Sequence, residues 1–406
     1  MPQITDLQDY MVLSASINYQ LTADPVNWQA VLSLARDDPY ARRGEDDVLV
    51  PLLKYLNDAY GGTTRRLGPL AVLHPIRTAT LLLRTVQDPP LADLVTALLH
   101  DKEEDLTRDR YEATVVGAAS GASPGAPARR ARRRERVKTW EEIEAVYQAQ
   151  LRSMAPDWRM AERVEALTRR EGEDYFAYLG RVLNAAREIP ELVSVKLADR
   201  LDNTLDMSVD IRSATKDVDC FELVFDVLFT SSHVGRRLPL DHPVTGRLNG
   251  SRRLYQLYKN TIFLSILRQR RMDHIDPQAQ RLFQALAFWS LRQARQVLVH
   301  LFMFHVTDHE TQRKLVTEVL AYCQEGRIAK VLPGGAEDSL DGVFERVFHI
   351  ADKDELHAAL DALYKKKEMM TRVAIAMAAT FSSFRNDPTF FIEGIDACGL
   401  HARTDP

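Results

Sequence analysis

The sequence predicts an all-α fold. Apolar residues recur at helical spacing along most of the 406 residues, and the strict apolar–polar alternation of β-strands is scarce. We find neither an internal repeat nor a glycine-rich phosphate loop. At this length the chain can form two domains and bury a full core without disulfides.

Composition indicates an ordinary globular protein. Hydrophobic residues make up 45% and charged residues 27%, and the net charge of -4 argues against a nucleic acid as the partner of the whole surface. Three widely separated cysteines form no CxxC pair, which is typical of free thiols in a reducing compartment. No secretion signal is seen, and the apolar runs are too short to cross a bilayer. We therefore expect a cytoplasmic protein without a membrane partner.

Residues 1–60 are predicted to be helical. One apolar stripe includes Trp28 and Leu32, and a second runs from Val48 to Leu56. The sequence Gly61-Gly62-Thr63-Thr64 ends this region and begins a polar loop that carries Arg65 and Arg66.

Two helices are expected next. The first begins near His74, because Pro75 suits a first helical turn, and it ends near Val86. After the turn Asp88-Pro89-Pro90, a second helix is predicted from Leu91 to Asp105. Its apolar run, Leu91 to Leu99, indicates burial and leads directly into His100 and Asp101.

Residues 112–136 are predicted to be a flexible insertion within the first domain. They contain a Gly/Ala/Ser/Pro-rich stretch followed by an arginine run from Arg129 to Arg136. The arginines could contact RNA or an acidic partner, but no aromatic residues are interleaved for base stacking. A solvated linker is the favoured interpretation, so no nucleic-acid partner is expected.

Helices are predicted for most of the remaining chain. Thr139 and Glu142 fit a capping box, which marks the next helix start. Lys196, Asp199 and Asn203 are spaced by three and four, so they share one helix face. Further helices are expected at 174–187, 254–267, 279–304, 310–323, 340–349, 355–364 and 369–384.

His74, His100, Asp101 and Asp199 form a candidate metal-ligand set. A lone buried histidine is usually a hydrogen-bonded core residue, and adjacent His-Asp pairs occur by chance. His74 and Asp199, however, sit at helix positions flanked by apolar residues that must face a core, where charged groups are costly unless they are paired or metal-bound. Two imidazoles and two carboxylates suit a borderline or hard divalent ion.

Glu104 and Asp105 are the candidate catalytic residues. They lie one helical turn beyond Asp101, where one could deprotonate or orient a water and the other could position it. The alternative is a plain acidic helix end. The helix macrodipole disfavours acidic residues at a C-terminus, which favours a functional role.

Four segments in register resemble the HD-superfamily hydrolase domain of RelA/SpoT-type proteins. The segments are Arg65 to Ile76, His100-Asp101-x-x-Glu104-Asp105, Leu167 to Gly172, and Lys196 to Asn203. With the insertion set aside, the resemblance covers roughly residues 40 to 215. It implies an HD-domain helical bundle over residues 1–215, followed by a second α-helical module over 216–406.

The resemblance also implies an activity. The family hydrolyses the 3′-pyrophosphate of ppGpp or pppGpp to GDP or GTP and pyrophosphate, usually with one Mn²⁺. Carried over by position, His74, His100, Asp101 and Asp199 would be the metal ligands, and Glu104 and Asp105 the acidic pair. Arg65 and Asn203 would contact the nucleotide, and Lys196, on the face of Asn203, is assigned to substrate binding with them.

Departures from the family leave alternatives open. The family usually has a histidine where this chain has Asp202, an acidic group that could repel a polyphosphate. Nothing after residue 215 resembles the family's α/β synthetase domain, so no synthetase activity is expected. An HD-type nucleotidase or dNTP triphosphohydrolase is the second enzyme hypothesis. A non-catalytic nucleotide-binding signalling module is the alternative from another class.

The C-terminal half contains a histidine cluster, His300, His305 and His309. The sequence Thr307 to Glu310 fits a capping box, so a helix start is expected between the last two histidines. This argues against a second metal site. We expect a helical module either for self-association into a homo-oligomer or for binding a partner.

Overall fold

A computed structural model describes residues 7–23, 25–36, 45–63, 70–86, 88–113, 138–209, 220–229, 250–274, 277–324, 343–344, 347, 350, 352–396 and 399–400. The chain divides into two compact units. The first unit comprises Met1–Arg169 and Ala185–Asp202, and the second comprises Arg170–Asn184 and Asn203–Pro406. The boundary predicted near residue 215 lies outside the described residues, as does nearly all of the insertion predicted at 112–136.

The all-α prediction is confirmed. The described chain is helical apart from connecting segments and one antiparallel pair of two-residue strands, β1 (Ile395–Asp396) and β2 (Gly399–Leu400). Within the described part of the chain, no helix combines the length and the apolar character needed to span a membrane.

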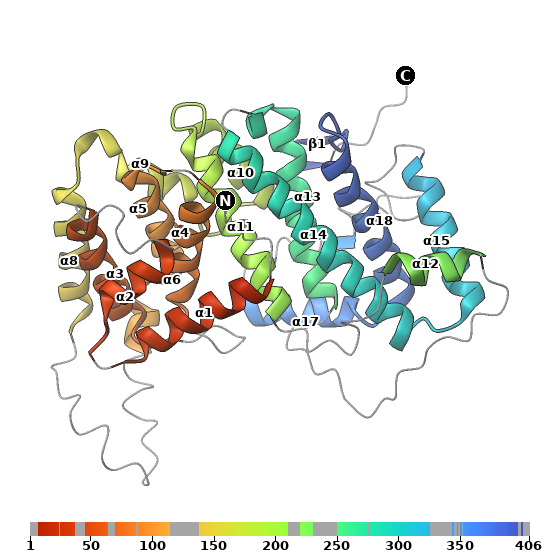
Figure 1. Cartoon of the computed structure of the whole chain (residues 1–406), viewed down its shortest axis with the longest axis horizontal. Helices are drawn as coiled ribbons and strands as arrows, with labels where there is room; N and C mark the ends of the chain where they lie inside the picture. Colours follow the sequence, from red (N-terminus) through yellow and green to blue (C-terminus); the bar gives the residue numbers. More distant parts are fainter. Residues whose placement is uncertain are drawn as a thin grey trace, which may run out of the picture. The chain divides into compact units, whose positions relative to one another are not determined.

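The first unit holds the predicted ligand residues. Its described helices are α1 (Leu7–Leu21), α2 (Trp28–Arg36), α3 (Asp46–Tyr60), α4 (Leu73–Thr85), α5 (Leu91–Leu99), α6 (Lys102–Asp105), α8 (Trp140–Ser153), the 3-10 helix η2 (Pro156–Trp158), α9 (Met160–Leu167) and the first part of α11 (Glu191–Val209). In Figure 1 these helices, except α11, run from red to yellow in sequence order.

Helices α4 and α5 form the centre of this unit. They pack side by side, and α1 and α2 pack on α4 while α3 and α9 pack on α5 (Figure 1). Every residue from Leu73 to Leu82 is buried, and so is every residue from Ala92 to Leu99. A helix that is buried on all sides belongs to the core, as the apolar run of α5 predicted.

The helix predicted from Leu91 to Asp105 is interrupted, which corrects the sequence analysis. Helix α5 ends at Leu99, and Asp101 leaves the helical region with φ −99° and ψ 5° before α6 begins at Lys102. The acidic residues therefore follow the N-cap of a new helix. The macrodipole argument for their functional role was wrong, because negative charge is favourable at a helix N-terminus.

The predicted start of α8 is confirmed. Helix α8 begins with the predicted capping box, in which Thr139 accepts from the Glu142 backbone N–H and the Glu142 side chain accepts from that of Thr139. At α15 (His309–Gln324) the helix begins after His305 as predicted, but the N-cap is Asp308 rather than Thr307, since Asp308 Oδ2 accepts from the Thr311 backbone N–H at 2.8 Å. The predicted helix at 340–349 lies largely outside the described residues.

The second unit is built around three long helices. Its described elements are α10 (Tyr175–Ala185, all but its last residue), the end of α11, α12 (Cys220–Phe229), α13 (Gly250–Gln269), η3 (Met272–His274), α14 (Pro277–Phe304), α15 (His309–Gln324), α17 (Lys353–Leu363), α18 (Lys367–Asn386), β1 and β2. Helices α13, α14 and α18 pack against one another, α15 packs on α18, and α17 packs on α13 (Figure 1).

Candidate metal centre

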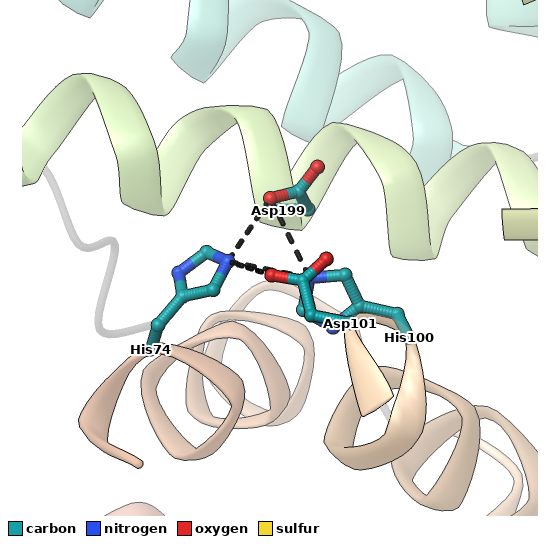
Figure 2. Close-up of side chains that lie close together, drawn as sticks. All are labelled: His74, His100, Asp101 and Asp199. Carbon is teal, nitrogen blue, oxygen red and sulfur yellow. Dashed lines mark hydrogen bonds and ion pairs between the residues drawn. The ribbon is translucent and has the colours of Figure 1, made fainter. Parts of the chain in front are cut away.

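Three segments of the first unit bring four predicted ligand residues together. His74 lies in the first turn of α4, His100 and Asp101 lie in the turn between α5 and α6, and Asp199 lies on α11. Figure 2 shows Asp199 extending from α11 toward the two imidazoles. The ligand atoms of the four side chains all lie within 4.8 Å of one another.

Short contacts join the two imidazoles to the two carboxylates. His74 Nε2 lies 3.1 Å from Asp101 Oδ2 and 3.2 Å from Asp199 Oδ1. His100 Nε2 lies 3.1 Å from Asp101 Oδ1 and 3.5 Å from Asp199 Oδ1 (dashed lines in Figure 2). The two Nε2 atoms are themselves only 3.3 Å apart. One small volume thus collects two imidazole nitrogens and the oxygens of two acids.

Hydrogen bonds on the far side of each ring set the tautomers. His100 Nδ1 lies 2.8 Å from the Ala97 carbonyl oxygen, which can only accept, so Nδ1 carries the proton. His74 Nδ1 lies 2.7 Å from Asp202 Oδ2 and donates to that carboxylate. In the neutral form of each ring, the lone pair on Nε2 therefore points into the cluster.

The protonation of the cluster favours a bound cation. Burial alone would raise the pKa of the Asp101 and Asp199 carboxyls and lower that of His100. The opposite charges outweigh this, so both carboxyl pKa values fall well below their usual range. The two carboxylates also raise the pKa of His100 to about 9. The cluster therefore attracts positive charge, either a proton on His100 or a metal ion that replaces it.

These residues fit a divalent metal ion. Imidazole and carboxylate ligands bind such ions at about 2.0 to 2.2 Å, so one ion can reach all four ligand atoms with small side-chain adjustments. His74, His100 and Asp199 are buried, and the Asp101 side chain is 22% exposed, which leaves one side accessible. Among the described residues, these four are the His, Cys, Asp or Glu side chains that lie close enough together, in a group of at least three, to hold a metal ion.

Asp202 was not predicted to belong to the site, yet it holds His74 in place. Besides His74, its carboxylate accepts from Tyr10 Oη at 2.7 Å and from Arg77 Nε and Nη2 at 2.9 and 3.0 Å. Asp202 is 0% exposed and Arg77 is 1% exposed. The guanidinium lowers the pKa of Asp202 against the opposing effect of burial, which keeps this carboxylate an acceptor.

Asp202, which stands where the family that the sequence resembles usually has a histidine, thus has a structural role as the partner of His74 and Arg77. The side chain faces the interior of the first unit and its charge is paired, so it does not present a negative charge to solvent. A spacing signal was available in the sequence. Arg77 lies three residues after His74 on α4, and Asp202 lies three residues after Asp199 on α11, so each lies on the face of its helix that carries a ligand.

Lys196 contacts a ligand residue directly. Its Nζ lies 2.7 Å from Asp199 Oδ2, which leaves Oδ1 of the same carboxylate toward the histidines. Among the groups that lower the pKa of Asp199, the charge of this lysine has the largest effect. The structure therefore gives Lys196 a role in orienting this ligand, and its predicted contact with substrate stays a prediction.

Glu104 lies beside the cluster on α6. Its Oε1 accepts from the Arg169 backbone N–H at 2.5 Å, so the segment after α9 fixes this carboxylate. Burial, followed by the negative charge of Asp101, raises the pKa of Glu104. A carboxylate with a raised pKa is a stronger base than an ordinary glutamate.

The remaining predicted site residues are less closely tied to the cluster. Asp105 is 38% exposed, and its Oδ1 lies 3.2 Å from Arg110 Nη1, which also donates to the Glu104 carbonyl oxygen. Asn203 is half-buried and follows Asp202 on α11. Arg65 lies outside the described residues.

Comparisons of the chain with protein-family models, curated proteins and solved structures found no match. The geometry of the four side chains supports a group that could hold a metal ion.

Proposed function

We propose that the first unit is a metal-dependent phosphohydrolase of the HD type. The observation that carries the proposal is the buried cluster of His74, His100, Asp101 and Asp199, in which the Nε2 atoms of both rings face two ionised carboxylates. A structural histidine pair does not require two acids beside it. Burying such charges is costly, and a divalent ion would balance both carboxylates, whereas Lys196 pairs with Asp199 alone of the two.

These four residues would hold the ion, for which we propose Mn²⁺. A divalent ion bound here would polarise a phosphate oxygen and lower the pKa of a bound water. Asp202, Arg77 and Tyr10 keep His74 oriented, and Lys196 keeps Asp199 oriented. Pre-oriented ligands of this kind are typical of metal centres.

Glu104 is the proposed general base. Of its two carboxylate oxygens, Oε1 is held by the Arg169 N–H, and the described residues supply no hydrogen-bond donor to Oε2. Oε2 can accept the proton of an attacking water. Asp105 follows on the same short helix and is proposed to help position that water together with Arg110.

The proposed substrate is (p)ppGpp, hydrolysed at its 3′-pyrophosphate to GDP or GTP and pyrophosphate. The support is the resemblance of the four sequence segments to RelA/SpoT-type hydrolase domains. Arg65, Lys196 and Asn203 are the proposed substrate contacts, and we expect the reaction to take place in the cytoplasm. Self-association through the C-terminal helices stays a prediction.

The experiment is a turnover assay with the full-length protein and Mn²⁺. The panel contains ppGpp, pppGpp, dGTP, ATP, a nucleoside monophosphate and a cyclic dinucleotide, and Asp101→Ala is the inactive control. We expect pyrophosphate release from ppGpp that Asp101→Ala abolishes. Turnover of another nucleotide would support the nucleotidase or triphosphohydrolase hypothesis. No turnover of any compound by a metal-loaded protein would favour a binding module and overturn the proposal.

A further inference from the structure

A second group of titratable side chains lies in the second unit. His300 near the end of α14 and His305 just after it have their rings 5.2 Å apart. His305 Nε2 lies 3.4 Å from Tyr364 Oη, and Lys367 Nζ lies 3.1 Å from the centre of the Tyr364 ring. We call His300, His305, Tyr364 and Lys367 the basic cluster.

The charged groups that act on the basic cluster are other bases. Burial, then His305, Lys367 and Arg253, lowers the pKa of His300 to about 4. Burial and then Lys367 lower the pKa of His305, and burial lowers the pKa of Lys367 to about 8. Burial and the nearby positive charges thus disfavour the protonated, charged forms of His300, His305 and Lys367.

No carboxylate among the described residues pairs with His300, His305 or Lys367. Asp361, one turn before Tyr364, is held by Arg252 through contacts of 2.9 and 2.6 Å. Arg253 adds positive charge that acts on His300. Its Nη1 donates to the Met207 carbonyl oxygen and to Gln293 Oε1, which are both uncharged. The cluster therefore has donors and positive charge without a described acidic partner.

The cluster is accessible and selects against cations. His305 is exposed, Lys367 and Tyr364 are half-buried, and the exposed Lys365 and Lys366 lie next to them in the chain. A metal ion on His300 and His305 would lie beside the Lys367 ammonium and gain no carboxylate. An anion gains from each of these groups and restores the charge that burial suppresses.

We propose that the basic cluster binds an anion of the phosphate class. Phosphate suits it because one ligand offers several acceptor oxygens in different directions, which can meet the Lys367 ammonium and the two imidazoles together. The proposal concerns side chains of the second unit and does not depend on the proposed phosphohydrolase activity. It gives the C-terminal module a ligand, either free phosphate or the phosphate group of a phosphomonoester.

The test uses full-length Asp101→Ala protein treated with EDTA, so that phosphate cannot bind through a metal at the first cluster. Inorganic phosphate and adenosine 5′-monophosphate are titrated separately in chloride buffer by calorimetry, and histidine C2–H resonances are followed by NMR. We expect one saturable site for at least one probe, with downfield shifts of two histidine signals as they gain protons. The probe that binds more tightly identifies the source.

Lys367→Ala and His305→Ala, each added to this background, should weaken binding at least tenfold, and Lys367→Arg should keep most of it. Lys314→Ala removes an exposed lysine of α15 and is the matched control, which should bind as before. His305 is exposed, so His305→Ala keeps the test decisive if Lys367→Ala fails to fold. Absence of binding of both probes, or binding that is unchanged in His305→Ala and Lys367→Ala, would overturn the proposal.

Discussion

The arrangement of the candidate centre depends on a carboxylate that is not one of its ligands. Asp202 joins His74 to Arg77 and Tyr10 in the interior of the first unit. Without Asp202 the Arg77 guanidinium would be buried without its carboxylate, and His74 would lose the acceptor that fixes its tautomer.

Asp202→Asn should weaken Mn²⁺ binding by about 10- to 100-fold, because the amide oxygen is a weaker acceptor for His74 Nδ1–H and no longer neutralises Arg77. Calorimetric titration with Mn²⁺ measures this. Asp93→Asn is the matched control, since it breaks a buried ion pair with Arg163 in the same unit at a residue that is not one of the four ligands. Equal Mn²⁺ affinity in folded Asp202→Asn and wild type would remove Asp202 from the site.

Glu104→Gln should keep Mn²⁺ and lose about two to four orders of magnitude in rate, as expected when a general base is replaced by its amide. The readouts are bound metal and kcat for pyrophosphate release. Glu103→Gln alters the preceding acid, whose side chain is 48% exposed and pairs with Lys102, and should leave the rate near wild type. A Glu104→Gln enzyme with the wild-type rate would transfer the role of base to another group.

At the scale of helices, the site depends on where α5 stops. The largely apolar α5 ends at Leu99, so His100 and Asp101 lie in a turn rather than on a continuous helix. The backbone N–H of Asp105 still donates to the Asp101 carbonyl oxygen at 2.8 Å. The turn lets two adjacent residues both direct their side chains at the histidine of α4, which successive positions of one helix do not favour.

Thr139→Ala should lower the free energy of unfolding by about 1 kcal/mol, because it removes the side-chain acceptor at the N-cap of α8. Urea denaturation of the full chain measures the change. Thr139→Ser keeps a hydroxyl acceptor and should stay close to wild type. If Thr139→Ser lost as much stability as Thr139→Ala, the capping hydrogen bond would not be the cause.

Helical periodicity predicted most elements, because it reflects the burial of one helix face. The four ligand residues were predicted from charged or polar side chains that adjoin apolar runs. Two features could not be predicted in the same way. The break at His100 has no glycine or proline to mark it in the sequence. The role of Asp202 depends on Tyr10, 192 positions away, and a single sequence holds no sign of that contact.

At the scale of the whole molecule, the two units carry different charge patterns at their clusters. The first unit gathers two carboxylates around two histidines, which raises the pKa of His100. The second unit gathers bases around two histidines, which lowers the pKa of His300. The pKa of the same residue type is thus raised in one unit and lowered in the other, as the proposed cation site and the proposed anion site require.

The stability of the chain should fall in acid through His300. Its pKa of about 4 in the folded chain lies below the unfolded value of about 6.5, so the unfolded chain binds more protons between these limits. This contribution is fully present above pH 6.5 and is lost as the pH falls to about 4. Urea midpoints measured in chloride buffers should decline less steeply over this range in His300→Gln, whereas an identical decline in both proteins would contradict the assignment.

The most direct test of the central claim is the stoichiometry of Mn²⁺ binding, measured by electron paramagnetic resonance of free and bound Mn²⁺. We expect one tightly bound ion per wild-type chain and none in folded Asp199→Ala or His100→Ala protein. Asp93→Asn should keep the ion. A wild-type chain that binds no Mn²⁺, or an ion that persists in both ligand variants, would contradict the assignment of this cluster as a metal centre.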